Sequence, residues 1–141
     1  MSRPTGRFSR SARVRKRPEF KRIQTEGRRV YTDHFVLLLR ARLPGEFSAD
    51  SSRLGVTVSR RVGSAVVRNR AKRLVREAFR GTRDLWDDDL DLVVIVRKSP
   101  GSMGLADVLS EWHHARRTLS RRAAEARKDR EKRQSELAQR G

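Results

Sequence analysis

The sequence predicts one small α+β domain around a single small sheet, and three observations support this fold class. A chain of 141 residues suits one domain with tails, since domains usually contain about 100–150 residues. Only 35% of the residues are hydrophobic, so the core must be small. Segments with apolar residues at helical spacing alternate along the chain with segments that have apolar residues at every second position.

The chain begins with a basic arm and a short helix. Residues 1–17 are rich in Ser, Arg and Gly, and they are expected to stay disordered until something anionic orders them. Pro18 suits the first turn of a helix that carries Phe20 and Ile23 on one side and ends at Gly27. The folded domain is therefore expected to span residues 18–119.

Two segments have the alternation that is typical of strands. Residues 28–42 predict two strands or one bent strand, and residues 53–60 predict another, after a loop at 43–52. In the first segment Phe35, Leu37 and Leu39 would face one side of the sheet, and Val36, Leu38 and Arg40 the other. In the second, Leu54, Val56 and Val58 would face one side, and Gly55, Thr57 and Ser59 the other. This last face is small and hydroxylated, so another chain can approach it closely.

Two helices and a buried strand complete the domain. Ser64 is a suitable N-cap for a helix that runs to about Gly81. The apolar run at 92–96 is typical of a strand that is buried on both faces. A last helix has apolar residues at helical spacing, namely Leu105, Val108, Leu109, Trp112 and Leu119. Residues 120–141 are strongly charged and predict either a solvated extension of this helix or a disordered tail.

The charge of the chain indicates a polyanionic partner. The net charge is +18 and the sequence pI is about 11.7, and a protein this basic repels itself unless an anion balances the charge. Nucleic acid is the first candidate and an anionic membrane surface the second. The chain has no cysteine and no apolar run of the roughly 20 residues that a membrane span needs, so a cytoplasmic protein is expected.

Residues 59–80, SRRVGSAVVRNRAKRLVREAFR, are both apolar and cationic. When residues 64–81 are placed on a helix, one sector holds Val67, Ala71, Leu74, Val75 and Ala78, and the opposite sector holds Asn69, Lys72, Arg73, Arg76 and Arg80. Such a charged sector is often merely solvated. Here it has almost no acids, although like charges four residues apart oppose helix formation by a few tenths of a kcal/mol. Arginine also favours bidentate phosphate contacts, so the sector predicts nucleic-acid binding.

RNA is a better candidate ligand than DNA. The sequence has no zinc-ligand spacing, basic zipper or clear helix-turn-helix pair. Readers of single-stranded RNA commonly offer a sheet surface on which bases lie, and Phe20 with the Gly55, Thr57 and Ser59 face would supply one. Plain core packing is the alternative role of Phe20.

The stretch RLGVTVSRRVGSAVVRNRAKRLVREAFR at 53–80 resembles the signature of the bacterial ribonuclease P protein subunit. The matching residues, in order, are Arg60, Arg61, Gly63, Ala65, Val66, Arg68, Asn69, Arg70, Lys72, Arg73, Leu74, Arg76 and Glu77. The resemblance extends from about Pro18 through the final helix and covers neither tail.

This resemblance implies the fold αβββαβα, with a four-stranded mixed sheet like that of ribosomal protein S5 domain 2. It also implies a left-handed βαβ crossover, against the usual handedness. In the family, one protein binds one large catalytic RNA, and together they remove the 5′ leader of precursor tRNA. The RNA carries the chemistry and binds most of the Mg²⁺ that it requires.

The resemblance also implies two sets of binding residues. Those expected to bind the catalytic RNA are Arg60, Arg61, Arg68, Asn69, Arg70, Lys72, Arg73 and Arg76. Those expected to bind the leader of precursor tRNA are Phe20, Val36, Leu38, Thr57 and Ser59. Many relatives have aromatic residues where this chain has Gln24 and Leu38, so base stacking would be weaker here and phosphate contacts more important.

The sequence offers no catalytic residue and no metal site of its own. Asp87, Asp88, Asp89 and Asp91 lie in one predicted turn, whereas the carboxylates of a two-metal nuclease normally come from separate elements. His113 and His114 are adjacent on a predicted helix and point about 100° apart, and His34 stands alone. A free-standing nuclease and a structural RNA-binding protein, such as a ribosomal component, are the competing hypotheses.

Overall fold

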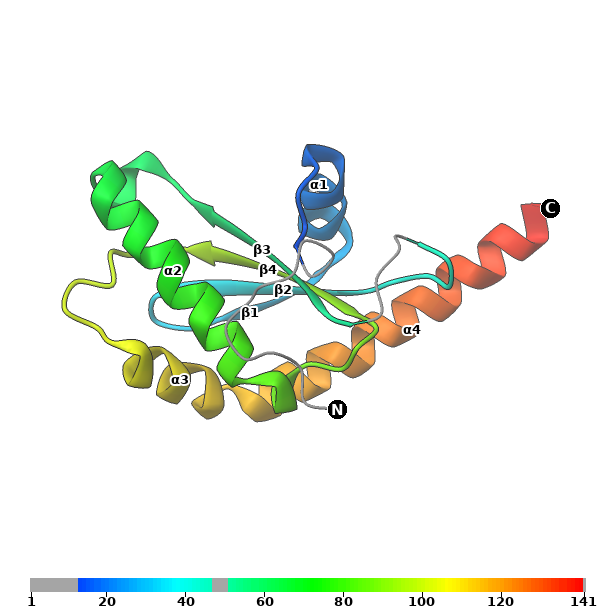
Figure 1. Ribbon diagram of the computed structural model, residues 1–141. Helices are drawn as coiled ribbons and strands as arrows, with labels where there is room; N and C mark the ends of the chain where they lie inside the picture. The colour runs from blue at the N-terminus through cyan, green and yellow to red at the C-terminus, as the bar shows by residue number, and fades with distance from the viewer. Residues whose placement is uncertain (1–12, 47–50, 141) are drawn as a thin grey trace, which may run out of the picture.

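The computed structural model describes residues 13–46 and 51–140, and these form one α+β unit (Figure 1). Its helices are α1 (Arg17–Glu26), α2 (Ala65–Gly81), α3 (Leu105–His114) and α4 (Arg116–Arg140). Its strands are β1 (Arg28–Tyr31), β2 (Phe35–Ala41), β3 (Arg53–Val58) and β4 (Leu90–Val96). Two single-turn 3₁₀ helices, η2 (Arg60–Val62) and η3 (Arg83–Leu85), flank α2. The α+β fold class predicted from the sequence is confirmed.

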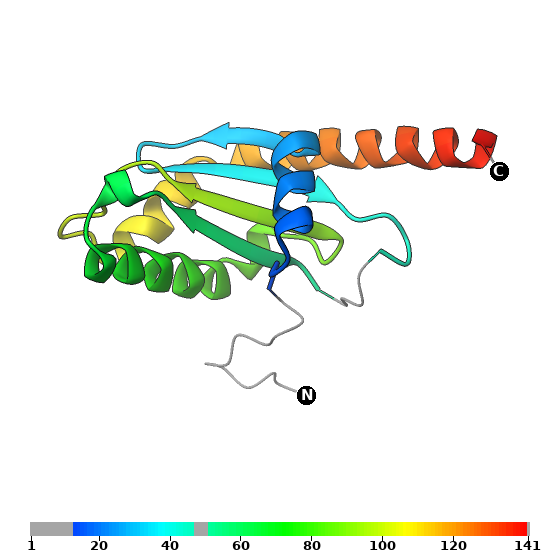
Figure 2. The same ribbon diagram turned by 90° about the horizontal axis from the view of Figure 1, so that it is seen from above.

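The four strands form one mixed sheet in the order β1-β2-β4-β3. β2 pairs antiparallel with both β1 and β4, whereas β3 and β4 are parallel neighbours. The helix α2 connects β3 to β4, and the two views show that this crossover is left-handed (Figures 1 and 2). The mixed sheet and the crossover handedness implied by the resemblance are confirmed.

Helices cover both faces of the sheet, because β2 and β4 are apolar on both sides. α2, α3 and α4 pack on one face and α1 crosses the other (Figure 2). The larger core lies under α2, α3 and α4 and contains Phe35, Phe79, Trp86 and Trp112. The smaller core lies under α1 and consists of Val14, Ile23, Val36, Leu38 and Val93. The alternation predicted for β2 and β3 therefore sorts the side chains correctly.

The described part of the N-terminal arm packs against the domain, and α1 already begins at Arg17. Val14 is buried, and its N–H donates to the carbonyl of Leu54 at 3.0 Å. Its side chain fills space beside Gly55, in the smaller core. The predicted arm otherwise falls on residues 1–12, which lie outside the described residues.

The C-terminal segment is two helices, whereas the sequence predicts one. The helical conformation is interrupted at Ala115, between α3 and α4. Of the two alternatives for residues beyond Ser120, a helix is present as far as Arg140, and its first half packs on β1 and β2. Ala123 and Ala126 are buried there together with Leu119, because their small side chains allow the helix to approach the sheet closely.

No helix in the ranges 13–46 and 51–140 is both long and apolar enough to cross a membrane. α4 is the longest of them, but its residues are mostly charged. Its length therefore does not indicate a membrane span.

Candidate nucleic-acid interface

α2 has two chemically opposite faces, as its sequence predicts. Its N-terminus is capped by Ser64, whose Oγ accepts a hydrogen bond from the N–H of Val67 at 3.3 Å. The face toward the sheet buries Ala71, Leu74, Val75, Ala78 and Phe79. This burial stabilises the helix against the sheet and fixes which side chains point outward.

The outer face of α2 is cationic, and we define it by Asn69, Lys72, Arg73, Arg76 and Arg80. Asn69 and Arg73 are exposed, and the other three are half-buried. Burial, and then the positive charge of Arg13, lower the pKa of Arg76. A bound phosphate would relieve this repulsion between cations.

The other basic residues predicted to bind the catalytic RNA lie in different surroundings. Arg60 and Arg61 are exposed in η2, just before α2. Arg70 donates hydrogen bonds to the carbonyls of Gly101 (2.9 Å) and Met103, so its guanidinium holds the loop after β4. The Nε of Arg68 is buried without a hydrogen-bond partner among the described residues.

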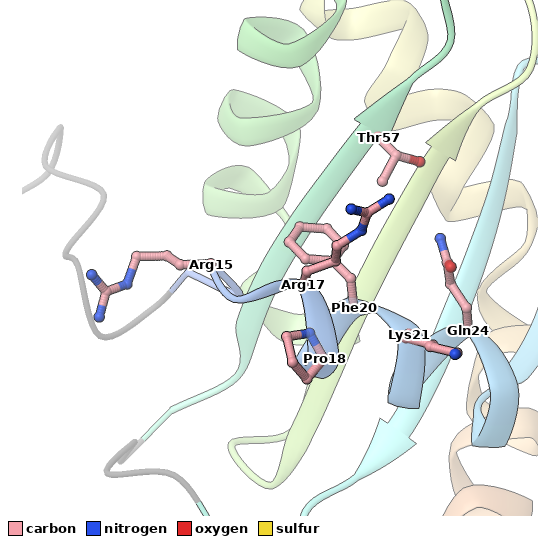
Figure 3. A pocket seen from close by; sticks show the side chains of 7 residues that line it. All are labelled: Arg15, Arg17, Pro18, Phe20, Lys21, Gln24 and Thr57. Atoms are coloured by element: carbon pink, nitrogen blue, oxygen red, sulfur yellow. The ribbon is translucent and has the colours of Figure 1, made fainter.

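A cleft of about 1080 Å³ lies between α1 and β3 (Figure 3). Its lining combines an aromatic ring, hydroxyl and amide groups and three cations: the residues are Arg15, Arg17, Pro18, Phe20, Lys21, Gln24 and Thr57. The ring of Phe20 lies directly on the backbone of β3 at Gly55. A Cβ at Gly55 would be 2.6 Å from Cε1 of that ring, so this close approach requires glycine.

The structure brings some of the predicted leader-binding residues together but not all. Phe20 and Thr57 line the cleft, and Ser59 is exposed just beyond the end of β3. Val36 is 7% exposed and Leu38 is 0% exposed, both in the small core under α1. In this arrangement Leu38 packs beneath α1 and does not line the cleft, and its contact with the leader stays a prediction.

Sequence reasoning missed the cations of this cleft. Arg15, Arg17 and Lys21 line it together with Phe20. The signal was present in the sequence, since basic residues precede and follow the Pro18 that starts the helix. The first two were instead assigned to a disordered arm.

Ion pairs with buried arginines tie α1 to the sheet. Glu19 pairs with Arg53 at 2.8 Å, and Arg53 also pairs with the fully buried Asp91 at 2.7 Å. At the other end of α1, Glu26 pairs with the buried Arg40 at 2.8 Å. α1 forms one wall of the cleft, and these ion pairs fix it to the sheet at two points along its length.

The acidic segment between α2 and β4 binds the protein's own arginines. Asp89 pairs with Arg127 (3.0 Å) and Arg130 (2.8 Å) of α4, and Asp87 also pairs with Arg127. Asp91, predicted to lie in the same surface turn, is a buried residue of β4. Over the described ranges, no group of three or more His, Cys, Asp or Glu residues could hold a metal ion.

The isolated histidine has an acidic partner. His34 Nδ1 lies 2.7 Å from Oε1 of Glu111, so the expectation that His34 stands alone is wrong. Burial acts to raise the pKa of Glu111, but hydrogen bonds from Thr32 and His34 outweigh it, so the pKa is lowered. This carboxylate fastens α3 to the β1–β2 turn.

Comparison with known proteins places this geometry in a family. A sequence model described as ribonuclease P matches residues 8–120. The chain belongs to the ribonuclease P protein family. The matched range contains α1, the whole sheet, α2 and α3, and therefore both the cationic face and the cleft. It ends within the first turns of α4.

Curated relatives and solved structures agree with this family. The ribonuclease P protein component of Syntrophus aciditrophicus is 40% identical over 104 residues, which cover 74% of this chain and 83% of that protein. A solved Staphylococcus aureus ribonuclease P protein is 30% identical with a TM-score of 0.63, covering 74% of this chain and 92% of its own. That of Thermotoga maritima is 34% identical with a TM-score of 0.61, covering 72% and 92%.

Proposed function

We propose that this chain is the protein subunit of a cytoplasmic ribonuclease P, an endoribonuclease that removes the 5′ leader of precursor tRNA. In this proposal one copy binds one catalytic RNA through the outer face of α2, and the cleft between α1 and β3 holds the leader. Family membership supports the assignment to the particle. The opposite faces of α2 are the observation that carries the assignment of the surfaces.

The outer face of α2 suits a folded RNA because it presents cations on a rigid helix. Leu74, Val75 and Phe79 anchor the helix in the core, so Arg73 and its neighbours are held in fixed relative positions. Guanidinium groups bind phosphate oxygens through paired hydrogen bonds. A backbone contact of this kind recognises the shape of an RNA and contributes affinity that falls with salt.

The cleft suits a single strand. Phe20 is the one aromatic ring among the described residues that line it, and one base could stack on this ring for about 1–3 kcal/mol. Arg15, Arg17 and Lys21 line the same cleft and could follow the phosphates of the same strand. Because Gln24 occupies the next turn of α1, binding here would depend more on phosphates than on stacking.

Catalysis is assigned to the RNA, which would bind most of the Mg²⁺. Two of the four aspartates considered as metal ligands, Asp89 and Asp91, are used in internal ion pairs with arginines. The protein would then lower the electrostatic repulsion between the catalytic RNA and the precursor tRNA, and it would position the leader of the precursor. Such a role matters most when Mg²⁺ is scarce.

Reconstitution at low Mg²⁺ tests this function. The full chain is mixed with a bacterial ribonuclease P RNA and a precursor tRNA, and 5′ cleavage is compared with that by the RNA alone. The proposal predicts strong stimulation by the wild-type chain and weaker stimulation by the double variant Asn69→Ala/Arg73→Ala. Absence of stimulation by the wild-type chain would rule the function out.

A further inference from the structure

α4 is attached to the domain by one side only. Arg127 and Arg130 reach Asp89, and Arg133 donates to the carbonyl of Ala41 at 3.1 Å. Asp129 pairs with Arg28 of β1 at 2.8 Å. The far end of the helix extends past the edge of the sheet (Figures 1 and 2). The side of α4 away from these contacts faces outward along its full length.

This outward side carries a row of cations, which we call the α4 stripe: Arg117, Arg121, Lys128 and Lys132. At 100° per residue the four lie within a sector of about 60°, and they extend over about 22 Å of the helix axis. All four are exposed. Within residues 13–46 and 51–140, none of them has an ion-pair or hydrogen-bond partner.

The acids of α4 neutralise the stripe only in part. Glu125 lies within 3.4 Å of Arg28 and 2.9 Å of Arg122, and Asp129 pairs with Arg28. Glu131 and Glu136 have no such pairing among the described residues, and Glu136 lies four residues after Lys132. The helix thus uses two of its four acids to bind the domain, and the four cations of the stripe outnumber the two acids that remain.

Two like-charged pairs within the stripe oppose the stability of the helix that carries it. Arg117 and Arg121 are four residues apart, and so are Lys128 and Lys132. Each like-charged pair at this spacing costs a few tenths of a kcal/mol, whereas opposite charges there would stabilise the helix by a similar amount. The same pattern occurs on the outer face of α2, and in both helices an external polyanion would remove the cost.

RNA fits this surface better than a membrane does. A helix that lies on a bilayer needs an apolar side to insert, but the apolar residues of α4, such as Leu119, Ala123 and Ala126, face the sheet. The row of exposed cations instead suits a phosphate backbone. α4 also lies in the same helical layer as α2, on the opposite edge of the sheet (Figure 2).

We propose that the α4 stripe is a second phosphate-binding surface, which contacts a segment of the catalytic RNA that α2 does not reach. This inference rests on the proposed function, since it takes the same RNA as the ligand. It goes beyond the matched family range, because Arg121, Lys128 and Lys132 all follow residue 120. The surface would increase affinity and orient the protein on the RNA.

Neutralisation of the stripe tests the inference. The variant replaces Arg117, Arg121, Lys128 and Lys132 with Gln, which is a good helix former. A matched control exchanges Arg for Lys and Lys for Arg at the same four positions, so the charge is kept. Binding of the ribonuclease P RNA is measured over a salt series, and the slope of log affinity against log salt concentration should fall in magnitude by about 3 in the variant alone.

A second variant separates binding from folding. Ala124 is exposed and lies between Arg121 and Lys128 on the stripe. Ala124→Glu places an acid four residues before Lys128, which should leave the helix as stable or more stable. The inference predicts weaker RNA binding with an unchanged or higher melting temperature.

The outcomes distinguish the inference from the proposed function. An unchanged salt slope in the four-Gln variant, with stimulation of cleavage by the wild-type chain intact, would overturn the inference and leave the function standing. The inference would also be overturned if the four-Gln variant lost binding to phosphatidylserine vesicles but kept its binding to RNA. That result would assign the stripe to a membrane surface. A wild-type chain that stimulates no cleavage would overturn both.

Discussion

At the scale of single residues, Gly55 shapes the proposed leader cleft by having no side chain. The ring of Phe20 occupies the space that a Cβ would need, and Val14 Cβ lies 3.1 Å from the same point. The ring is therefore held close against β3, and it lines the cleft. The position of the Phe20 ring in the cleft therefore depends on a residue of the neighbouring strand β3.

Gly55→Ala should displace this ring. Its Cβ would overlap Cε1 and Cζ of Phe20 at 2.6 and 2.8 Å, so we expect a loss of about 1–3 kcal/mol in stability. We also expect weaker binding of precursor tRNA that has a leader. Mature tRNA, which lacks the leader, is the control ligand in the same binding assay. Equal weakening for both RNAs would contradict a leader site at Phe20.

Arg73→Ala should weaken catalytic RNA binding without unfolding the domain. Arg73 is exposed on α2, so its loss leaves no cavity. We expect the magnitude of the salt slope to fall by about 1, with the melting temperature unchanged. Arg140→Ala, at the exposed end of α4, removes the same charge and should leave binding near that of the wild type. The measurement is a salt series for both variants.

At the scale of elements, the two faces of α2 contribute to different properties: one face to the stability of the fold and the other to the proposed binding of RNA. The buried face holds the helix between the sheet and α3. The outer face leaves its cations available to a ligand. Substitutions on the two faces should therefore affect different measurements.

Leu74→Ala should test the buried face. Leu74 is 8% exposed, so the variant leaves a cavity and should cost about 2–5 kcal/mol. This is a large part of the roughly 5–15 kcal/mol that holds a domain together. Val66→Ala is the matched control, because Val66 is 77% exposed on the same helix and should change stability by less than about 0.5 kcal/mol. Urea unfolding of both variants provides the comparison.

Asp89→Asn should weaken the attachment of α4 in a pH-dependent way. Burial acts to raise the pKa of Asp89, but hydrogen bonds from Arg127 and Arg130 outweigh it, so the pKa in the folded protein is lowered. A lowered pKa stabilises the fold above the unfolded value of about 4, and this contribution is lost as the pH falls through the folded value. The variant should therefore be less stable at pH 7, with a difference that shrinks below about pH 4.

Unfolding midpoints in urea between about pH 3 and pH 7 measure this difference. Asp88→Asn is the control, because the Asp88 side chain forms no ion pair with any described residue. A stability difference for Asp89→Asn that is constant over the whole pH range would show that its carboxylate charge is not what holds α4.

At the scale of the whole molecule, the spacing of apolar residues predicts which side of a strand or helix is buried. It does not predict which other elements pack against that side. The spacing of Leu54, Val56 and Val58, and of the apolar residues of α2, assigns each side chain to the correct side. The break at Ala115 was not predictable, since apolar residues continue at helical spacing across it. The depth of Leu38 was not predictable either, because it depends on how closely α1 packs.

The ion-pair partners of the charged residues were likewise not predictable from the sequence. Asp87 to Asp91 look like one acidic turn in the sequence, but Asp91 is buried between Arg42 and Arg53, and Asp89 binds α4. Those partners lie 38 or more residues away. Pairing at such separations follows from the topology of the sheet and from the packing of α4, which local patterns do not contain.

Site-directed crosslinking in the reconstituted particle tests the central claim most directly, and the absence of native cysteines allows single-site labelling. A photoreactive group is attached to Asn69→Cys on α2 or to Thr57→Cys in the cleft. The account predicts that the first crosslinks to the catalytic RNA and the second to the leader of precursor tRNA. Crosslinking of the Thr57→Cys probe to the catalytic RNA alone, or no RNA crosslink from Asn69→Cys, would contradict it.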